Sequence, residues 1–198
     1  MARSLKKLIA AVFCLVLLFE LSSCAENTKS AEQTGFSMGS LVGIKLYGKN
    51  SEALENANLL AEVVKTDERI SKNYEGSDIY RVNSSGEYGE TVSSETYDEL
   101  RTVCDVYSDS HGKAAVLSGA LTELWGFDTD EFRLPSEDEI LSAKEKCGDD
   151  KLIFDDGKKV YIPDGAKLNL GSAGKGIALD EAVKRIDEIN SQGGKMLI

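Results

Sequence analysis

The sequence has few of the residues that most often build catalytic and metal sites. Its 198 residues include one histidine, His111, and four cysteines. A Ser-His-Asp hydrolase would depend on His111, yet no nucleophile motif accompanies it. The cysteines and the histidine do not have the spacing of metal ligands. The sequence therefore gives no support for histidine-dependent hydrolysis or for a zinc centre.

Basic residues are also scarce. Lysine and arginine number 23 against 34 aspartates and glutamates, so the formal net charge is −11. This acidity argues against nucleic acid as a partner and against adhesion of the folded domain to an anionic membrane. Any phosphate site must be locally positive against this background. The 198 residues are enough for one domain with a real core. The 41% of hydrophobic and 29% of charged residues indicate a globular rather than a disordered chain.

The N-terminus has the regions of a secretory signal. Basic residues in the first seven positions precede the apolar run 8–19, which is too short to span a bilayer comfortably. A Leu-Ser-Ser-Cys stretch follows and ends at Cys24, so the whole resembles a bacterial lipoprotein signal. We expect residues 1–23 to be removed and Cys24 to carry lipid, which would anchor the protein on the extracytoplasmic face of the cell membrane. The alternative is an ordinary secretory signal with a chance cysteine.

Residues 24–34 are mostly small and polar, which predicts a tether, and a single domain is expected over 35–198. Two cysteines, Cys104 and Cys147, remain for this domain. Cys104 falls on the apolar face of a predicted helix, which is typical of a buried thiol. A disulfide between the two is permitted outside the cytoplasm, but two cysteines alone are weak evidence for one.

Period-two patterns and turn signals predict several strands. Apolar residues alternate over 41–47, as in a half-buried strand, and a turn sequence joins 152–154 to 160–162 as in a hairpin. The last residues, 193–198, resemble the beginning of a strand that stops at its most apolar residues. A buried strand does not normally end in this way, so we expect a C-terminally incomplete domain; a short terminal edge strand is the alternative.

Capping residues and apolar periodicity predict the helices, and together with the strands they indicate an α+β fold. Ser51 can cap a helix that runs toward Ile70, and Ser93 or Ser94 opens a second. A capping box at 136–139 opens a third, and a fourth follows residue 174. In the first and the last of these helices, the residues expected to face the core are Leu54, Ala57, Leu60, Ala61 and Val64, and Leu179, Ala182, Val183, Ile186 and Ile189.

The most informative stretch is 168–180, Leu-Asn-Leu-Gly-Ser-Ala-Gly-Lys-Gly-Ile-Ala-Leu-Asp. It predicts a short strand, a glycine turn, Lys175 and a helix, which is an arrangement suited to an anion. The spacing of a P-loop fails, because the glycine before the lysine comes only three residues after the first. The Rossmann fingerprint fails as well, since the glycines are ordered G-x-x-G-x-G. A plain strand-to-helix turn with an exposed lysine is the alternative to a phosphate site.

Together with this stretch, three earlier segments resemble the ApbE family of FAD:protein FMN transferases. They are 36–40 (FSMGS), 70–79 (ISKNYEGSDI) and 124–127 (LWGF), and they occur in the family's order. The resemblance runs from residue 35 to the end of the chain. It implies an enzyme that uses Mg²⁺ to transfer FMN from FAD to a threonine of a target protein through a phosphoester.

The resemblance also assigns candidate site residues, although it identifies no catalytic residue. Met38, Tyr74 and Lys175 match positions that contact FAD: Met38 near the flavin, Tyr74 against the ring system and Lys175 at a pyrophosphate oxygen or the adenine side. Ser172 stands where the family supplies a main-chain carbonyl to Mg²⁺. One carbonyl cannot bind Mg²⁺ alone, so further oxygen ligands are implied.

The chain departs from the family pattern at several positions. Asn169 stands where the family usually has aspartate, and Ala115 and Leu117 replace an acidic residue and a threonine. The family segment that supplies carboxylates to Mg²⁺ lies beyond residue 198. We therefore expect a poor or inactive transferase. The alternatives are a non-catalytic FAD-binding lipoprotein and an inactive fragment that does not fold stably.

Overall fold

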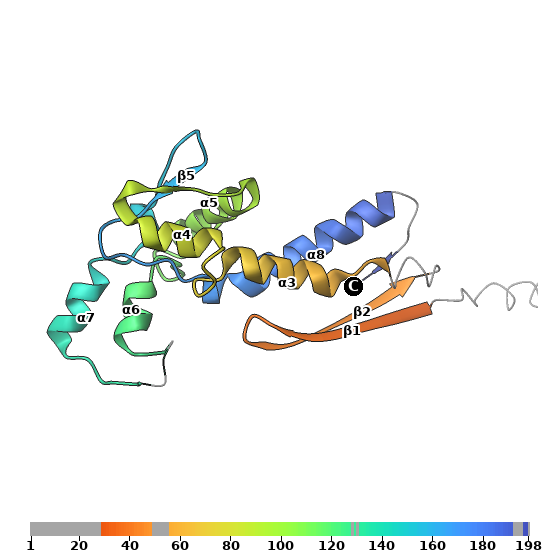
Figure 1. The fold of residues 1–198 in the computed structure, drawn as a ribbon, viewed down its shortest axis with the longest axis horizontal. Coiled ribbons are helices and arrows are strands. Elements are labelled where there is room, and N and C mark those ends of the chain that lie inside the picture. The colour runs from red at the N-terminus through yellow and green to blue at the C-terminus, as the bar shows by residue number, and fades with distance from the viewer. Residues whose placement is uncertain (1–28, 49–55, 128, 130, 192–195, 198) are drawn as a thin grey trace, which may run out of the picture.

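The computed structural model describes residues 29–48, 56–127, 129, 131–191 and 196–197. The predicted signal peptide and Cys24 lie outside these residues. The described part mixes helices and strands, which confirms the predicted α+β class (Figure 1). Its elements are β1 Lys29–Ser37, β2 Ser40–Gly48, α3 Leu59–Ile70, α4 Asp78–Ser85, η1 Gly86–Tyr88, β3 Glu90–Thr91, α5 Ser94–Asp109, α6 Gly119–Leu124, α7 Glu137–Lys144, η2 Asp149–Lys151, β4 Ile153–Phe154, β5 Lys159–Tyr161, η3 Leu170–Ser172, α8 Gly174–Ser191 and β6 Met196–Leu197.

A long hairpin, β1–β2, forms most of the first sheet, with β6 antiparallel to β2 on the other side. The strand predicted over 41–47 is confirmed. The predicted tether is wrong for residues 29–34, because they pair with β2 from Lys29 opposite Gly48 onward. Their polar side chains mark a strand with one exposed face rather than an unstructured linker. The hairpin turns at Met38 and Gly39, whose φ angles of 51° and 67° suit a two-residue turn.

The predicted cap Ser51 and the predicted core residue Leu54 lie outside the described residues, and helix α3 begins at Leu59. Asn58, at its start, is left-handed with φ 45° and ψ 46°, so the helical period starts afresh at Leu59. The buried residues are Leu59, Val63, Thr66 and Ile70. Of the predicted face, Ala57 is buried and Leu60 packs partly buried against the same core cluster, whereas Ala61 and Val64 are exposed.

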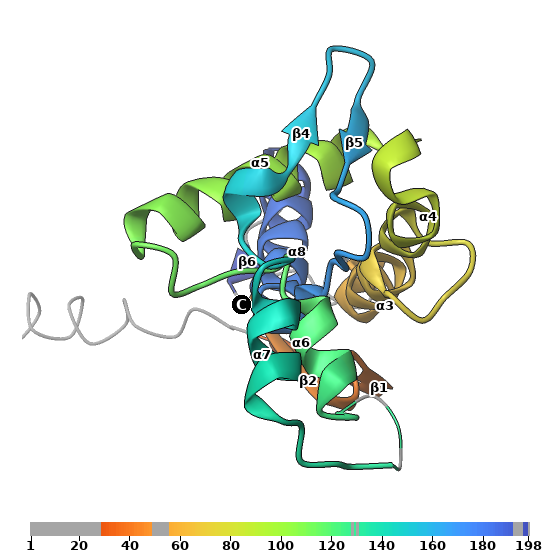
Figure 2. The same ribbon diagram turned by 90° about the vertical axis from the view of Figure 1, so that its left-hand side faces the viewer.

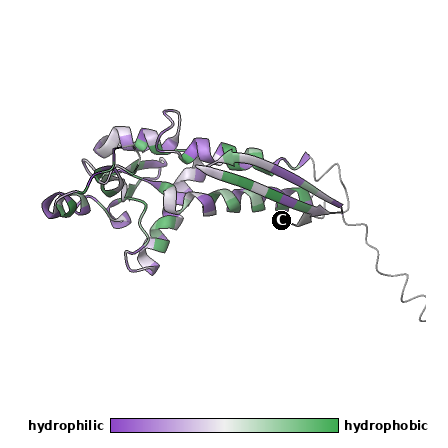
Figure 3. Ribbon diagram, turned by 90° about the horizontal axis from the view of Figure 1, so that it is seen from below, coloured by the Kyte–Doolittle hydropathy of each residue, from purple (hydrophilic) through white to green (hydrophobic). Residues whose placement is uncertain are grey.

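Helix α8 lies antiparallel to α3, and the two helices cover the hairpin (Figures 1 and 3). Ala178 and Ile186 of α8 pack with Val63 of α3 and with Ile44 and Leu46 of β2 in one core cluster. The predicted burial of Ala182 and Ile186 is confirmed. Leu179 and Val183, predicted to face the core, are exposed instead, since the helix turns residues 178 and 182 inward and their following neighbours outward.

A second core cluster lies beyond the ends of α3 and α8, among α4, α5 and the β3–β5–β4 sheet (Figure 2). The predicted helix at Ser93, the capping box at Ser136 and the hairpin of β4 and β5 are confirmed. Arg69 of α3 reaches Glu99 of α5 at 2.6 Å, which ties the two clusters together. None of the helices among the described residues is both long and apolar enough to span a bilayer.

The two cysteines of the domain are free thiols in the structure. Cys104 is half-buried on α5, and its Sγ donates to the carbonyl oxygen of Asp149 at 3.6 Å. Burial and the nearby carboxylates raise the pKa of Cys104 to about 11. The structure therefore agrees with a sheltered, protonated thiol at Cys104 and not with a disulfide to Cys147.

Candidate functional site

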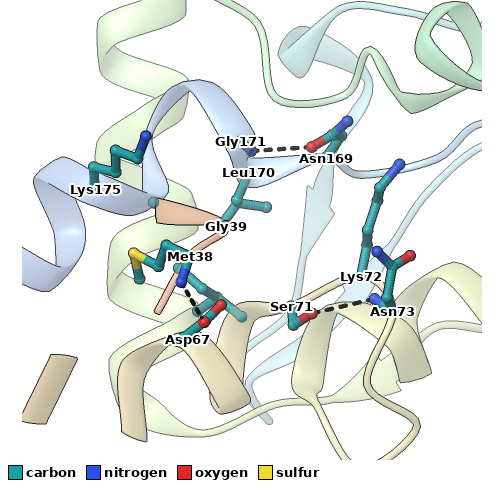
Figure 4. A pocket seen from close by; sticks show the side chains of 12 residues that line it. Met38, Gly39, Asp67, Ser71, Lys72, Asn73, Asn169, Leu170, Gly171 and Lys175 are labelled. Carbon is teal, nitrogen blue, oxygen red and sulfur yellow. Dashed lines mark hydrogen bonds between the residues drawn. The ribbon is translucent and has the colours of Figure 1, made fainter. Parts of the chain in front are cut away.

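A cavity of about 350 Å³ lies where the hairpin turn, the end of α3 and the start of α8 meet (Figure 4). Three segments far apart in the sequence form its walls: 38–39, 67–73 and 169–175. The volume is at the lower end of the range typical of small-molecule sites. The lining residues are Met38, Gly39, Asp67, Ile70, Ser71, Lys72, Asn73, Asn169, Leu170, Gly171, Gly174 and Lys175.

The hairpin turn is held at the cavity by Asp67. The Asp67 Oδ2 accepts hydrogen bonds from the Met38 backbone N–H at 2.6 Å and from Ser37 Oγ at 2.9 Å. These bonds fix Met38 in its left-handed conformation, which is unfavourable for a residue with a side chain. Asp67 is therefore a site residue that the sequence analysis missed. An acidic residue one turn before the Ile70 segment is the signal that could have found it.

The glycine stretch begins with Asn169, whose side chain shapes the turn. Its Oδ1 accepts from the Gly171 N–H at 3.0 Å, and its Nδ2 donates to Thr122 Oγ1 at 3.1 Å. The strand predicted before the turn is wrong, because residues 166–169 belong to no described strand, and Leu170–Ser172 forms a short 3-10 helix. Helix α8 then starts at Gly174.

The start of α8 forms one wall of the cavity. The first amides of a helix have no intrahelical acceptor and carry the positive end of the helix dipole. Gly174 allows this end to come close to α3, since a Cβ there would lie 3.3 Å from Ile70 Cδ1. The same close approach brings Lys175 to the cavity.

Two lysines supply the positive charge that a phosphate site needs in this acidic protein. Lys175 and Lys72 lie on opposite sides of the cavity (Figure 4). Within the described part of the chain, Lys175 Nζ has no hydrogen-bond or ion-pair partner. Its charge is available to a ligand, whereas Asp67 already accepts two hydrogen bonds from the protein.

The structure brings together two of the four predicted site residues of the domain. Met38 and Lys175 both line the cavity. Tyr74 does not: its side chain is 54% exposed and its ring lies against Gly76, while the neighbouring Asn73 takes the place in the wall. Ser172 is exposed and also lies outside the lining. The roles given to these residues toward FAD and Mg²⁺ stay predictions.

Of the three departures from the family pattern, the structure places only Asn169 at the cavity. Leu117 is 1% exposed and packs in the second core cluster. Ala115 is half-buried and does not line the cavity. Two of the departures, Ala115 and Leu117, therefore lie away from this cavity.

The described residues do not by themselves make a Mg²⁺ site. Among them, no three side chains of histidine, cysteine, aspartate or glutamate are grouped so that they could hold a metal ion. Asp67 is the single carboxylate in the cavity lining, and its Oδ2 holds the hairpin turn. Mg²⁺ in proteins needs near-octahedral oxygen ligands, usually from one or two carboxylates, substrate phosphates and waters. The described side chains therefore identify no ligand set for Mg²⁺, and the main-chain carbonyl at Ser172 stays a prediction.

The chain is similar in sequence to one family of proteins over most of its length. The model of the ApbE family matches residues 38–195. An FAD:protein FMN transferase of Haemophilus influenzae is 22% identical over 200 aligned residues, which cover 95% of this chain and 58% of the relative. The likeness is thus low in identity but extends over nearly the whole chain.

Solved structures give the same fold. The ApbE protein of Thermotoga maritima superposes with a TM-score of 0.76 at 27% identity, over 82% of this chain and 54% of its own. The apo flavinyl transferase ApbE of Pseudomonas stutzeri has a TM-score of 0.71 at 24% identity, over 86% of this chain and 56% of its own. The chain therefore spans a little more than half the length of the proteins that it matches.

Proposed function

Since the chain belongs to the ApbE family, we propose that its cavity binds FAD and that the protein acts in the transfer of FMN from FAD to a threonine of a target protein. One observation carries the proposal. Among the described residues, Lys175 has no hydrogen-bond or ion-pair partner, and it stands at the start of α8 beside a glycine turn, in a cavity that Met38 also lines. A diphosphate fits this chemistry, because helix amides and a lysine together favour a multiply charged anion.

The cavity residues have distinct tasks in this proposal. Lys175 and the first amides of α8 bind the diphosphate and lower its negative charge. Met38, held by Asp67, offers a polarisable apolar surface to the flavin ring. In the transfer, the threonine oxygen forms a bond to the FMN phosphorus, the P–O bond to AMP breaks, and the threonine proton leaves to a base. The described residues do not identify that base.

The dependence on Mg²⁺ is proposed from the family alone. One lining carboxylate, Asp67, is too few to hold the ion without the diphosphate. For this reason, and because Asn169 lacks the usual charge, we expect this chain to bind FAD and to transfer FMN poorly. A non-catalytic FAD-binding lipoprotein is the second candidate, and the neutral Asn169 in the cavity wall favours it.

The test combines binding and transfer. Flavin fluorescence is titrated with the full chain, and the chain is then incubated with FAD, Mg²⁺ and a target domain that carries an acceptor threonine. Covalent flavin on the target is read by in-gel fluorescence, with the Thr→Ala target as control. Quenching with little transfer supports our expectation. Transfer at the rate of a full-length family member would show that the chain is a competent enzyme, and absent quenching would contradict both candidates.

We further propose that Cys24 is lipidated and anchors the protein on the extracytoplasmic face of the membrane. The basic start, the apolar run 8–19 and the cysteine support this proposal. Labelling with an alkyne fatty acid and fractionation provide the test. The wild-type chain should be labelled and sediment with membranes, and Cys24→Ala should be unlabelled. Equal labelling of both chains would contradict the proposal.

A further inference from the structure

The backbone groups of residues 167–169, just before the glycine turn, are hydrogen-bonded, although the segment belongs to no described sheet. Leu168 is fully buried, at 0% exposure, so its backbone groups need partners within the protein. Partners for the backbone of the whole segment come from two places that are distant in sequence, and both groups of Leu168 bond to the first of them. One is the side chain of Asn83 on α4, and the other is the loop 116–119.

Asn83 makes the same pair of bonds that a neighbouring strand would make. Its Oδ1 accepts from the Leu168 N–H at 2.7 Å, and its Nδ2 donates to the Leu168 carbonyl at 2.9 Å. A carboxamide offers one acceptor and two donors on a short side chain, so it can satisfy both backbone groups of one residue. Lys167 Nζ also donates to the Asn83 carbonyl oxygen at 2.7 Å.

The loop 116–119 holds the same segment from its flanks. The Asn169 N–H donates to the Val116 carbonyl at 2.8 Å, and the Gly119 N–H donates to the Lys167 carbonyl at 2.8 Å. The loop is itself fixed by Asp149, which is 2% exposed. Asp149 Oδ1 accepts from the Leu117 N–H at 2.7 Å and from the Val116 N–H at 3.0 Å.

These bonds reach the cavity through Asn169. Its backbone is fixed by the loop, and its side chain shapes the turn at Gly171. Both residues line the cavity, whereas Asn83 does not. A shift of Leu168 would therefore move the wall of the cavity, although no group of Asn83 reaches it.

We propose that Asn83 is a positioning residue: its carboxamide replaces a strand partner for Leu168 and so sets the glycine turn in the geometry that binds the flavin nucleotide. The proposal rests on the proposed function for the identity of the ligand. Its structural part, that the side chain of Asn83 fixes the turn, holds for the chain without ligand. The two parts can be tested separately.

The binding test compares Asn83→Ala and the volume-matched Asn83→Asp with the wild type. Asn83→Asp keeps an acceptor for the Leu168 N–H but sets a carboxylate against the Leu168 carbonyl. The control is Val103→Ala on α5, in the second core cluster and outside the cavity lining. It lowers stability without removing a hydrogen bond of the segment 167–169, so it separates the bonds of Asn83 from a general loss of stability.

We expect both Asn83 variants to raise the Kd for FAD by about ten-fold or more, and Val103→Ala to leave it unchanged within the error. The measurement is flavin fluorescence quenching at a temperature where all four chains are folded. Wild-type affinity in a folded Asn83→Asp or Asn83→Ala variant would overturn the proposal. So would an equal loss of affinity in Val103→Ala at matched thermal stability.

A measurement on the ligand-free wild type covers the cases in which a variant does not fold or the chain binds no FAD. Amide hydrogen exchange at Leu168 and Asn169 should be at least about a hundred-fold slower than in an unstructured peptide, although neither residue lies in a helix or a sheet. Exchange at free-peptide rates in the folded chain would overturn the positioning role. Protection without any FAD binding would support that role and contradict the proposed function alone.

Discussion

Removal of the Lys175 charge gives the sharpest test of how the cavity binds its ligand. In Lys175→Gln, the ligand phosphate loses a charge-assisted hydrogen bond, worth about 1.5–3 kcal/mol, which corresponds to about 10- to 150-fold in Kd. Lys175 is exposed at the cavity mouth, so solvent and salt screen the contact. We therefore expect a value near the lower end, about ten-fold at low ionic strength.

The matched control is Lys184→Gln, a change of the same charge on the same helix. Lys184 pairs with Glu181 at 2.6 Å and its side chain is 65% exposed. It lies about 13 Å from Lys175 along the helix axis, which is beyond the Debye length of about 8 Å at physiological salt. Lys184→Gln should therefore leave the Kd for FAD within about 1.5-fold of wild type.

The assay is quenching of flavin fluorescence at 50 mM and at 500 mM NaCl. The loss caused by Lys175→Gln should be large at low salt and smaller at high salt, and the control should show no loss at either. Equal effects of the two variants would mean that only the net charge of the protein matters. No effect of Lys175→Gln would refute the assignment of the diphosphate to the start of α8.

Three further predictions concern the surroundings of the site and the fold. Asp67→Ala removes the acceptor for Met38 and Ser37; it should lower the free energy of unfolding in urea by about 1–3 kcal/mol and weaken FAD binding, and unchanged values would contradict the role of Asp67. The pKa of Cys104 is raised from 9.0 to about 11, so at pH 8 the folded chain holds about a hundred-fold less Cys104 thiolate than the urea-unfolded chain. Alkylation of Cys104 by iodoacetamide should be slower in the folded chain by a similar factor. Equal rates would contradict the burial of this thiol. Hydrogen bonds from the Ser136 amide, Arg133 and the Ser136 hydroxyl lower the pKa of Glu139 from 4.5 to about 2. This carboxylate therefore stabilises the folded state fully above pH 4.5, and the effect is lost as the pH falls through about 2. Glu139→Gln should make Tm fall less steeply between pH 4.5 and 2, and an unchanged dependence of Tm on pH would refute the capping role.

The features that short-range chemistry determines were predictable from the sequence. The capping box at Ser136, the helix start at Ser93 and the hairpin of β4 and β5 each depend on contacts within a few residues. The family resemblance also depends on short motifs, and two of the residues that it singles out, Met38 and Lys175, line one cavity in the structure. Their contacts with FAD stay predictions.

The features that depend on tertiary contacts were not predictable. Asp67 reaches Met38 across 29 positions, and Asn83 reaches Leu168 across 85, so neither contact leaves a local pattern. Ala61 and Val64 are exposed, contrary to the predicted core face, because the left-handed Asn58 restarts the helical period. Residues 29–34 form a strand through pairing with β2, although their composition is typical of a linker.

The central claim is that the cavity between the hairpin turn and α8 binds a flavin nucleotide. Amide chemical shifts of the labelled full chain, followed during titration with FAD, test it most directly. If FAD binds in this cavity, the largest changes in amide chemical shift occur at four lining residues, Gly39, Asn73, Gly171 and Gly174. The absence of saturable shifts, or a cluster of shifts on α6 and α7 instead, would contradict the claim.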